Sequence, residues 1–409
     1  MSKSVFLYFV FLWALFSFKL PLLPWNAASI RIDDFLIFIA SILIFKFIFK
    51  KTFSKKTIPL TLKIYILFCL FYIFSSLINS ATEKVHLIES ILYSIRGIEY
   101  LLFFYFGYYL SNFKKDFYST FKWYLLYSLI IVIFQKNGYL GDFTSFSLEA
   151  GRAIANAGGP WEFAAMAAFG FIYLLFSNNK ILSSVMLYLT YSSLSRITLL
   201  ALLLIYTKSI YKYIYNNFFI FCILFFTVLS FFTYSNLFES VSSRYASVAN
   251  GNLIENIHYL YDYATPALNR DDYIEDAFVT SLDHIFELPG DTSLNVRLYR
   301  WSTLIKTVFS SVESTLIGLG PSFAWVAVDG NYIRIFTEVG FLGSIIFFLF
   351  VIAFYCEKST PAYLKMYFTL LVISALMIDI FVTYKAMMLF WFFYGHSFGR
   401  NRLKERGGT

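Results

Sequence analysis

The sequence predicts an all-α, polytopic membrane protein with about twelve transmembrane helices and one large loop that carries short helices. Hydrophobic residues make up 59% of the 409 residues and charged residues only 14%, whereas soluble domains carry about 25% charge. The mean hydropathy is +0.65. Apolar runs long enough for a spanning helix, about 17–25 residues, recur along the chain and are interrupted by one long polar segment, 235–330. Lipid is therefore expected to be the main solvent.

Twelve apolar segments fit a spanning helix. They are 5–22, 33–49, 58–78, 88–110, 121–136, 160–177, 181–194, 197–215, 217–234, 331–355, 362–383 and 386–399. The first run is long, and no small-x-small cleavage site follows it before Pro21 and Pro24. We therefore interpret it as a span and not as a signal peptide.

The distribution of Lys and Arg predicts the orientation. With the N-terminus assigned to the cytoplasm, the loops on that side hold most of the lysines, and the C-terminal tail adds Arg400, Arg402, Lys404 and Arg406. Because cytoplasmic loops carry an excess of Lys and Arg, both termini are predicted to be cytoplasmic.

The same assignment places residues 235–330 outside the membrane on the opposite side. This segment holds twelve acidic and five basic residues. The net charge of +8 thus reflects cytoplasmic anchoring, and no nucleic-acid partner is expected. Three regions follow: residues 1–234 form an N-terminal bundle of about nine helices, 235–330 a large loop or lid, and 331–409 about three helices with a basic tail.

Two kinds of site are not expected. Cys69, Cys222 and Cys356 all lie in apolar runs, which predicts no disulfide framework. The four histidines show no metal-ligand spacing. We therefore expect neither a metal nor a cofactor.

The candidate site centres on residues 291–343. Arg297 and Arg300 are three residues apart, so a helix would place both guanidinium groups on one face. Guanidinium groups suit phosphate and remain charged at physiological pH. After Gly318, Gly320 and Pro321, which break a helix, Asp329 stands just before the next apolar span. Asp329 is either a base or sugar-orienting group, or simply the start of that helix.

Further arginines fall on the same predicted side. Arg152 lies in the loop 137–160, Arg196 in a tight turn between two spans, and Arg334 near the start of another span. A single arginine at a helix end often only reaches the lipid headgroups. Several together predict an anion site.

Other polar groups have two interpretations each. Glu162 follows Pro160 in the first turn of a predicted helix, which favours capping over a substrate-binding role. Arg96 and Glu99 are spaced to pair with each other within a span. Asp379 is a carboxylate inside a span without an obvious local partner.

Four short motifs carry a resemblance to a known family. They are NAGGPWEFAA (156–165), LSRITLLALLL (194–204), NVRLYRW (295–301) and DGNYIRIFTEVGFLG (329–343). In their order and sidedness the chain resembles the bacterial O-antigen polymerase and ligase superfamily, and is most similar to a Wzy-type O-antigen polymerase. The ligases carry a histidine where this chain has Asp329, followed by Gly-x-x-Gly, here Gly340 and Gly343. That departure favours the polymerase.

The resemblance implies a glycosyltransferase of the bacterial inner membrane. It would transfer a glycan chain from undecaprenyl pyrophosphate to a sugar hydroxyl of a lipid-linked repeat unit at the periplasmic face, without a metal. Implied partners are the lipid-linked donor and acceptor, membrane lipid and a chain-length regulator protein. The catalytic candidates are Asp329, Arg196, Arg297 and Arg300. The substrate-binding candidates are Arg152, Glu162, Asn331 and Arg334.

Two other functions stay open at this stage. An O-antigen ligase would attach the finished glycan to lipid A-core. A flippase or transporter would move a lipid-linked oligosaccharide without covalent chemistry, and such proteins typically contain structural repeats. The sequence shows no internal repeat, and its one large loop is placed asymmetrically.

Overall fold

The protein is helical, with one short pair of strands. The computed structural model describes residues 2–18, 21–23, 30–52, 58–113, 117–139, 152–205, 252–277, 285, 288–289, 292–325 and 328–407. The N-terminal elements are α1 (Lys3–Phe16), β1 (Pro21–Leu23), β2 (Ile30–Arg31), α2 (Ile32–Leu43), α3 (Phe45–Thr52), α4 (Leu60–Ala81), α5 (Leu87–Tyr109), η1 (Leu110–Asn112), α6 (Phe117–Lys136), α7 (Pro160–Phe176), α8 (Lys180–Ser192) and the helix Arg196–Ile205.

Short helices follow, and then a second group of long ones. The short helices are α12 (Asn252–Tyr263), α13 (Arg270–Glu275), α15 (Thr292–Val308) and α16 (Val312–Ile317). The last elements are α17 (Asn331–Cys356), α18 (Ala362–Ser374), η4 (Ile380–Val382) and α19 (Tyr384–Gly407).

Most described helices begin near a predicted span, but several are shorter than predicted: α18 ends at Ser374, whereas the predicted span continued to residue 383. Within the described residues, three are long and apolar enough to cross a membrane: α4, α6 and α17. The predicted span 5–22 is wrong at its end, because α1 stops at Phe16 and the chain then forms β1, which pairs antiparallel with β2. Pro21 opens β1 and cannot continue a helix hydrogen-bond ladder. The span 33–49 is divided into α2 and α3, and the span 217–234 lies outside the described residues.

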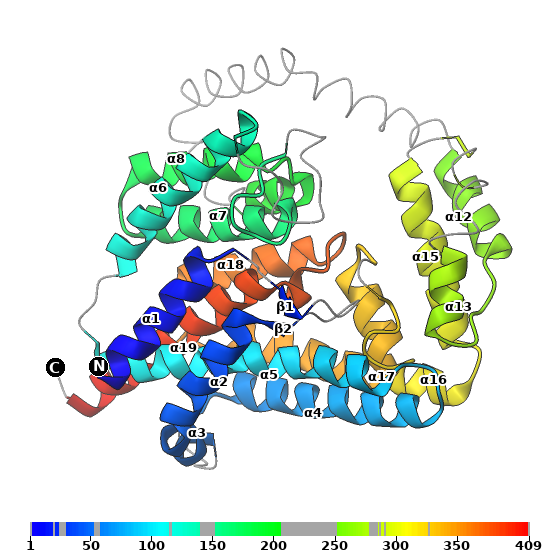
Figure 1. The fold of residues 1–409 in the computed structure, drawn as a ribbon, viewed down its shortest axis with the longest axis horizontal. Helices are drawn as coiled ribbons and strands as arrows, with labels where there is room; N and C mark the ends of the chain where they lie inside the picture. The colour runs from blue at the N-terminus through cyan, green and yellow to red at the C-terminus, as the bar shows by residue number, and fades with distance from the viewer. Residues whose placement is uncertain are drawn as a thin grey trace.

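Helix α5 packs against α19 and α4, and α4 packs against α17; α4 and α5 lie side by side in Figure 1. Glycines let α5 and α19 approach closely, since a methyl group added at Gly107 or Gly395 would meet the backbone of the other helix. Small residues at such crossings are typical of membrane helices. The core around them is rich in aromatic side chains, for example Phe104, Trp391 and Phe392.

A backbone joint links the end of the short-helix group to α17. Helix α16 ends at Gly318 (φ 81°), as the sequence predicts, and α17 is interrupted at Gly340 (φ 60°). The interruption leaves two carbonyl groups of α17 available: Leu319 N donates to Thr337 O (2.7 Å) and Gly320 N to Glu338 O (3.1 Å). No Cβ fits at either glycine, because the other segment's backbone would be 2.4–2.6 Å away.

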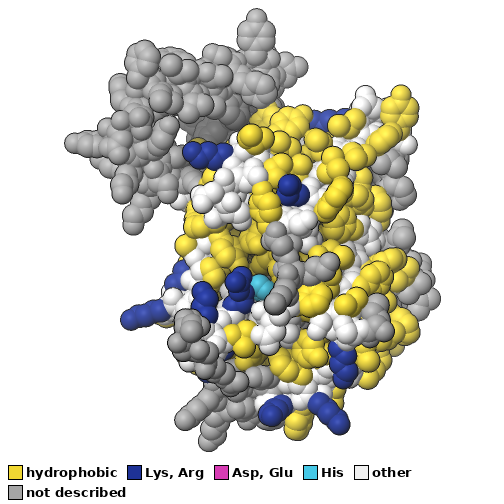
Figure 2. All heavy atoms as spheres, turned by 90° about the vertical axis from the view of Figure 1, so that its left-hand side faces the viewer, with side chains coloured by type: hydrophobic (Ala, Val, Ile, Leu, Met, Phe, Trp, Pro, Cys, Tyr) yellow, Lys and Arg dark blue, Asp and Glu magenta, His cyan; other side chains and the backbone are white. Residues whose placement is uncertain are grey.

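The two ends of the molecule differ. Helices α12, α13, α15 and α16 gather at one end, which we call the loop end, whereas α1 begins and α19 ends at the opposite, terminal end (Figure 1). Figure 2 looks onto the terminal end, where Lys and Arg side chains are spread among hydrophobic ones and no acidic side chain of the described residues is in view.

Candidate functional site

The first part of the candidate site joins two segments that are distant in sequence. The stretch before α7 is fixed to the turn after α8, because Ala153 N donates to Ser192 O (2.9 Å) and Arg152 Nε donates to Ser193 O (3.2 Å). Arg196 begins the next helix and is exposed. The fold therefore places Arg152 next to the turn that carries Arg196.

The second part joins α15 to the segment before α17. Arg297 Nε forms an ion pair with Asp329 Oδ2 at 3.0 Å, with side chains 31% and 33% exposed. Trp301, one turn along α15, donates its indole N–H to Val328 O (2.8 Å). Arg300 Nε donates to Ala277 O (3.3 Å). Because Arg297 and Arg300 share a helix, both guanidinium groups reach the same region.

Electrostatics connect the two parts. Burial lowers the pKa of the Arg152 guanidinium; the positive charges of Arg196 and Arg297 lower it further, whereas Asp329 raises it. Burial likewise lowers the pKa of Arg300, with Asp329 acting against that shift and Arg297 adding to it. Arg297 and Asp329 thus act on both Arg152 and Arg300. We call these five residues, Arg152, Arg196, Arg297, Arg300 and Asp329, the arginine site.

The arginine site has a clear chemical character. Arg297 pairs directly with Asp329, and the charge of this carboxylate also acts on the guanidinium groups of Arg152 and Arg300. Guanidinium forks bind phosphate oxygens through two parallel hydrogen bonds, and preorganised cations stabilise charge that develops on a leaving group. The site is suited to a ligand with several negative charges, next to a carboxylate that can accept a proton.

Arg334, also a candidate from sequence, lies in a different environment. Its side chain is 0% exposed and forms ion pairs with Glu338 (3.1 Å) and Asp379 (2.9 Å). Nη1 also donates to Tyr93 Oη (3.1 Å) and to Trp325 O (2.9 Å). Arg334 therefore contacts groups of the protein interior and is not accessible to a ligand from the surface.

Asp379 has no cationic partner in its local sequence but pairs with Arg334 in the structure. Besides the Arg334 pair, its Oδ2 accepts from Val328 N (3.0 Å) and its Oδ1 from Gly330 N (3.3 Å). These are the residues on either side of Asp329. Neither spacing nor hydropathy signals this contact, because Asp379 lies about fifty residues further along the chain.

Two more sequence candidates are buried in structural contacts. Glu162, 1% exposed, accepts from Gly158 N (2.6 Å), just before α7, and from Lys385 N (2.8 Å), in the first turn of α19. Asn331, 1% exposed, accepts at Oδ1 from Phe381 N (2.8 Å), and its own N–H donates to Ala375 O. Its Nδ2 has no hydrogen-bond partner among the described residues.

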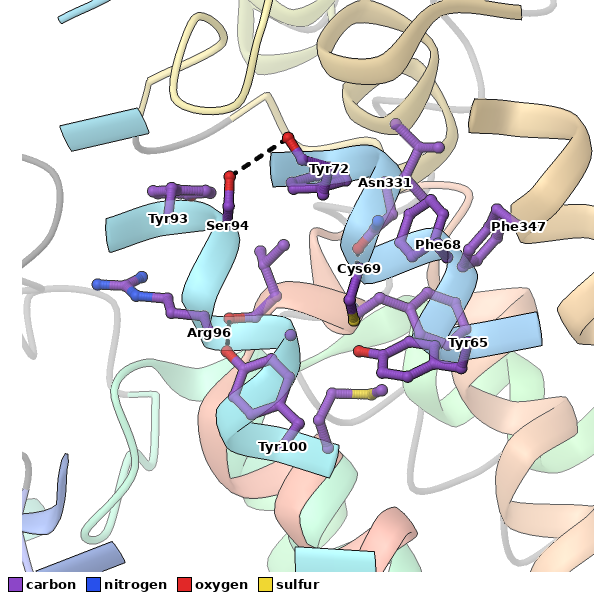
Figure 3. A pocket seen from close by; sticks show the side chains of 15 residues that line it. Tyr65, Phe68, Cys69, Tyr72, Tyr93, Ser94, Arg96, Tyr100, Asn331 and Phe347 are labelled. Atoms are coloured by element: carbon purple, nitrogen blue, oxygen red, sulfur yellow. Dashed lines mark hydrogen bonds between the residues drawn. The ribbon is translucent and has the colours of Figure 1, made fainter. Parts of the chain in front are cut away.

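Asn331 borders a cavity between α4, α5 and α17 (Figure 3). Tyr65, Phe68 and Cys69 form one side of it, and Arg96 extends away from their rings. The space open to the centres of water molecules is about 50 Å³, which is room for a few of them.

The predicted direct pairing of Arg96 with Glu99 is wrong. Glu99 forms its ion pair with Arg31 (3.2 Å), which also binds Asp34 (2.9 Å) and stacks over Tyr384 at 4.1 Å. Arg96 instead lies over the Tyr93 ring at 5.1 Å. The N-cap of α2 brings Arg31 to α5, a contact that helical spacing within one span does not reveal.

The described residues contain no group of three or more His, Cys, Asp or Glu side chains that would hold a metal ion. Comparison with protein-family models, with curated proteins and with solved structures finds no match for this chain.

Proposed function

We propose that this chain is a membrane glycosyltransferase that polymerises a polysaccharide of the O-antigen type. It would transfer a glycan chain from undecaprenyl pyrophosphate to the sugar hydroxyl of a lipid-linked repeat unit. The observation that carries the proposal is the arginine site, where Arg297 pairs with Asp329 and the charge of this carboxylate also acts on Arg152 and Arg300, which come from separate segments. A diphosphate is the ligand whose charge and shape match that arrangement.

The proposed reaction is a displacement at the sugar carbon attached to the diphosphate. The acceptor hydroxyl oxygen forms the new bond to that carbon, and the bond from the carbon to the diphosphate oxygen breaks. The bonding electrons leave with the diphosphate, where Arg297 and Arg300 stabilise the developing charge. The hydroxyl proton passes to Asp329, which lies 3.0 Å from Arg297. Atoms and charges balance without an added metal or cofactor.

The proposal includes a membrane topology. Twelve spans, cytoplasmic termini and a periplasmic loop would place the arginine site at the outer face of the inner membrane. Two observations support this sidedness. The terminal end displays Lys and Arg (Figure 2), as cytoplasmic surfaces do, and the α12–α16 helices gather at the opposite end (Figure 1). Lipid-linked substrates would then enter laterally from the outer leaflet.

The test compares surface polysaccharides from a strain that lacks the chain and carries a plasmid-borne variant. Loss of the polymerase leaves single repeat units attached to the lipid core, and the wild-type chain restores a ladder of long polymers. Arg297→Ala and Arg300→Ala are expected to abolish the ladder. Lysine at either position is expected to restore little, because the two-pronged contact is lost.

Arg402→Ala is the matched control. Arg402 is 37% exposed, similar to the 31% of Arg297, and also faces one carboxylate, Glu405, but it lies on α19 near the terminal end. The ladder is expected to persist. Full ladders from the Arg297→Ala/Arg300→Ala double variant would refute the proposal. An unmodified core with accumulated lipid-linked polymer in the deletion strain would instead identify a ligase.

A further inference from the structure

Asp329 is held in an unusual backbone conformation. Its φ angle is 54°, in the left-handed region that residues other than glycine rarely adopt, although Asp and Asn tolerate it best. Such conformations persist where the surroundings fix them. The contacts of the neighbouring residues show what does so here.

One carboxylate binds the backbone on both sides of Asp329. Asp379 accepts the N–H groups of Val328 and Gly330 through its two oxygens, at 3.0 and 3.3 Å. Two N–H groups that converge on one carboxylate define the path of the chain between them. The Asp329 side chain is thereby turned to the other side, toward Arg297.

Asp379 is itself fixed by Arg334. The guanidinium group binds Asp379 Oδ2 through Nη2 and uses Nη1 for Tyr93, Trp325 and Glu338. Because Arg334 is 0% exposed and has partners on several elements, it has little freedom to move. Arg334 therefore holds the Asp379 carboxylate in a fixed position.

The same segment is aligned with α15. Trp301 donates to Val328 O (2.8 Å), and its ring covers Gly330, where an added Cβ would be 2.9 Å from the ring. Arg297 lies one turn before Trp301. The contact of Trp301 with Val328 and Gly330 thus also fixes Asp329 relative to Arg297 on α15.

We propose that Asp379 is a positioning residue. It holds residues 328–330 so that the Asp329 carboxylate faces Arg297, and Arg334 orients it for that task. The effect on glycosyl transfer rests on the proposed function, whereas the effect on the backbone does not. Two separate measurements therefore test it.

The first measurement is chemical access to Val328, which is 0% exposed. Val328→Cys is introduced into the full-length chain after Cys69, Cys222 and Cys356 are replaced by serine or alanine. The rate of labelling by a membrane-impermeant maleimide is then recorded. Asp379→Asn is expected to raise this rate about tenfold, as the loss of a hydrogen bond to a charged group implies. An unchanged rate would overturn the proposal.

Two further variants keep this measurement interpretable. Asp379→Asn leaves Arg334 paired with Glu338, so the buried guanidinium group keeps a carboxylate. If that variant does not fold, the combination Arg334→Met/Glu338→Gln/Asp379→Leu removes every charge of the cluster and leaves residues 328–330 without their anchor. The matched control is Glu357→Gln, at the opposite end of α17, where the carboxylate binds Thr61 and Tyr394 hydroxyl groups. Its labelling rate is expected to equal that of the parent.

The second measurement is transfer kinetics with lipid-linked repeat units in vesicles. Asp379→Asn is expected to lower kcat while KM for the substrate stays unchanged, because the arginines that hold the diphosphate remain. Faster labelling with unchanged kcat would overturn the role in transfer. If Arg297→Ala and Arg300→Ala also leave polymer formation intact while labelling rises, the proposed function fails and the backbone role of Asp379 stands.

Discussion

Arg297 and Arg334 each face an aspartate at about the same distance, yet the two regions they belong to are built differently. Arg297 meets Asp329 at 3.0 Å with about a third of each side chain exposed. Arg334 meets Asp379 at 2.9 Å with none of its side chain exposed, and it binds three further groups. Exposure, and not the presence of an ion pair, separates a guanidinium group able to meet a ligand from one that holds the fold.

The largest effect should follow removal of the buried arginine. Arg334→Met leaves Glu338 and Asp379 buried without their cation, which costs about 3–5 kcal/mol when one partner of a buried pair is removed. We expect little folded protein, measured as the monodisperse fraction in size-exclusion chromatography after detergent extraction. A yield equal to that of wild type would show that the ion pairs of Arg334 with Glu338 and Asp379 are not needed for stability.

An intermediate effect is expected at Glu162, where the carboxylate joins the start of α7 to α19. Glu162→Ala leaves the buried N–H group of Lys385 unpaired, at a cost of about 1–3 kcal/mol, and removes the acceptor of the partly buried Gly158 N–H. Glu162→Gln retains acceptor oxygen and should lose less. In thermal unfolding of the detergent-solubilised protein, Tm is expected to fall from wild type to Glu162→Gln to Glu162→Ala. An equal Tm for all three would contradict the stabilising role of Glu162.

The smallest effect on stability is expected at the exposed arginine. Arg297→Ala removes a partly exposed ion pair, worth less than about 1 kcal/mol, so its Tm should nearly match that of wild type. Its polymer ladder should nevertheless disappear. Loss of product without loss of stability at Arg297 would contrast directly with the loss of stability expected at Arg334. A large fall in Tm would place Arg297 with the structural group.

The sequence predicted the elements better than their contacts. Hydropathy located the long helices because lipid-facing helices need continuous apolar runs. Local rules placed the start of α7 at Pro160 and the end of α16 at Gly318, both confirmed. The β1–β2 pair and the early end of α1 were not predicted, since a short apolar run at a strand does not differ from the end of a span.

Within the site, local spacing was predicted from the sequence, whereas contacts between distant residues were not. The spacing of Arg297 and Arg300 predicted a shared helix face, because i and i+3 are neighbours on a helix. The pairs Arg334–Asp379 and Arg31–Glu99 link residues 45 and 68 positions apart, and no local pattern encodes such contacts. Arg334 was expected among the substrate-binding groups for its charge, whereas its complete burial emerges only from the packing of four elements.

The glycine joint between Gly318 and Gly340 has a mechanical consequence. The strand-like bonds from Leu319 and Gly320 to the carbonyl groups of α17 tie the chain leading to Asp329 to a helix of membrane length. Helices of this length tilt to match the thickness of the surrounding bilayer. A change of bilayer thickness that tilts α17 is therefore expected to move Leu319 and Gly320 with it through this joint.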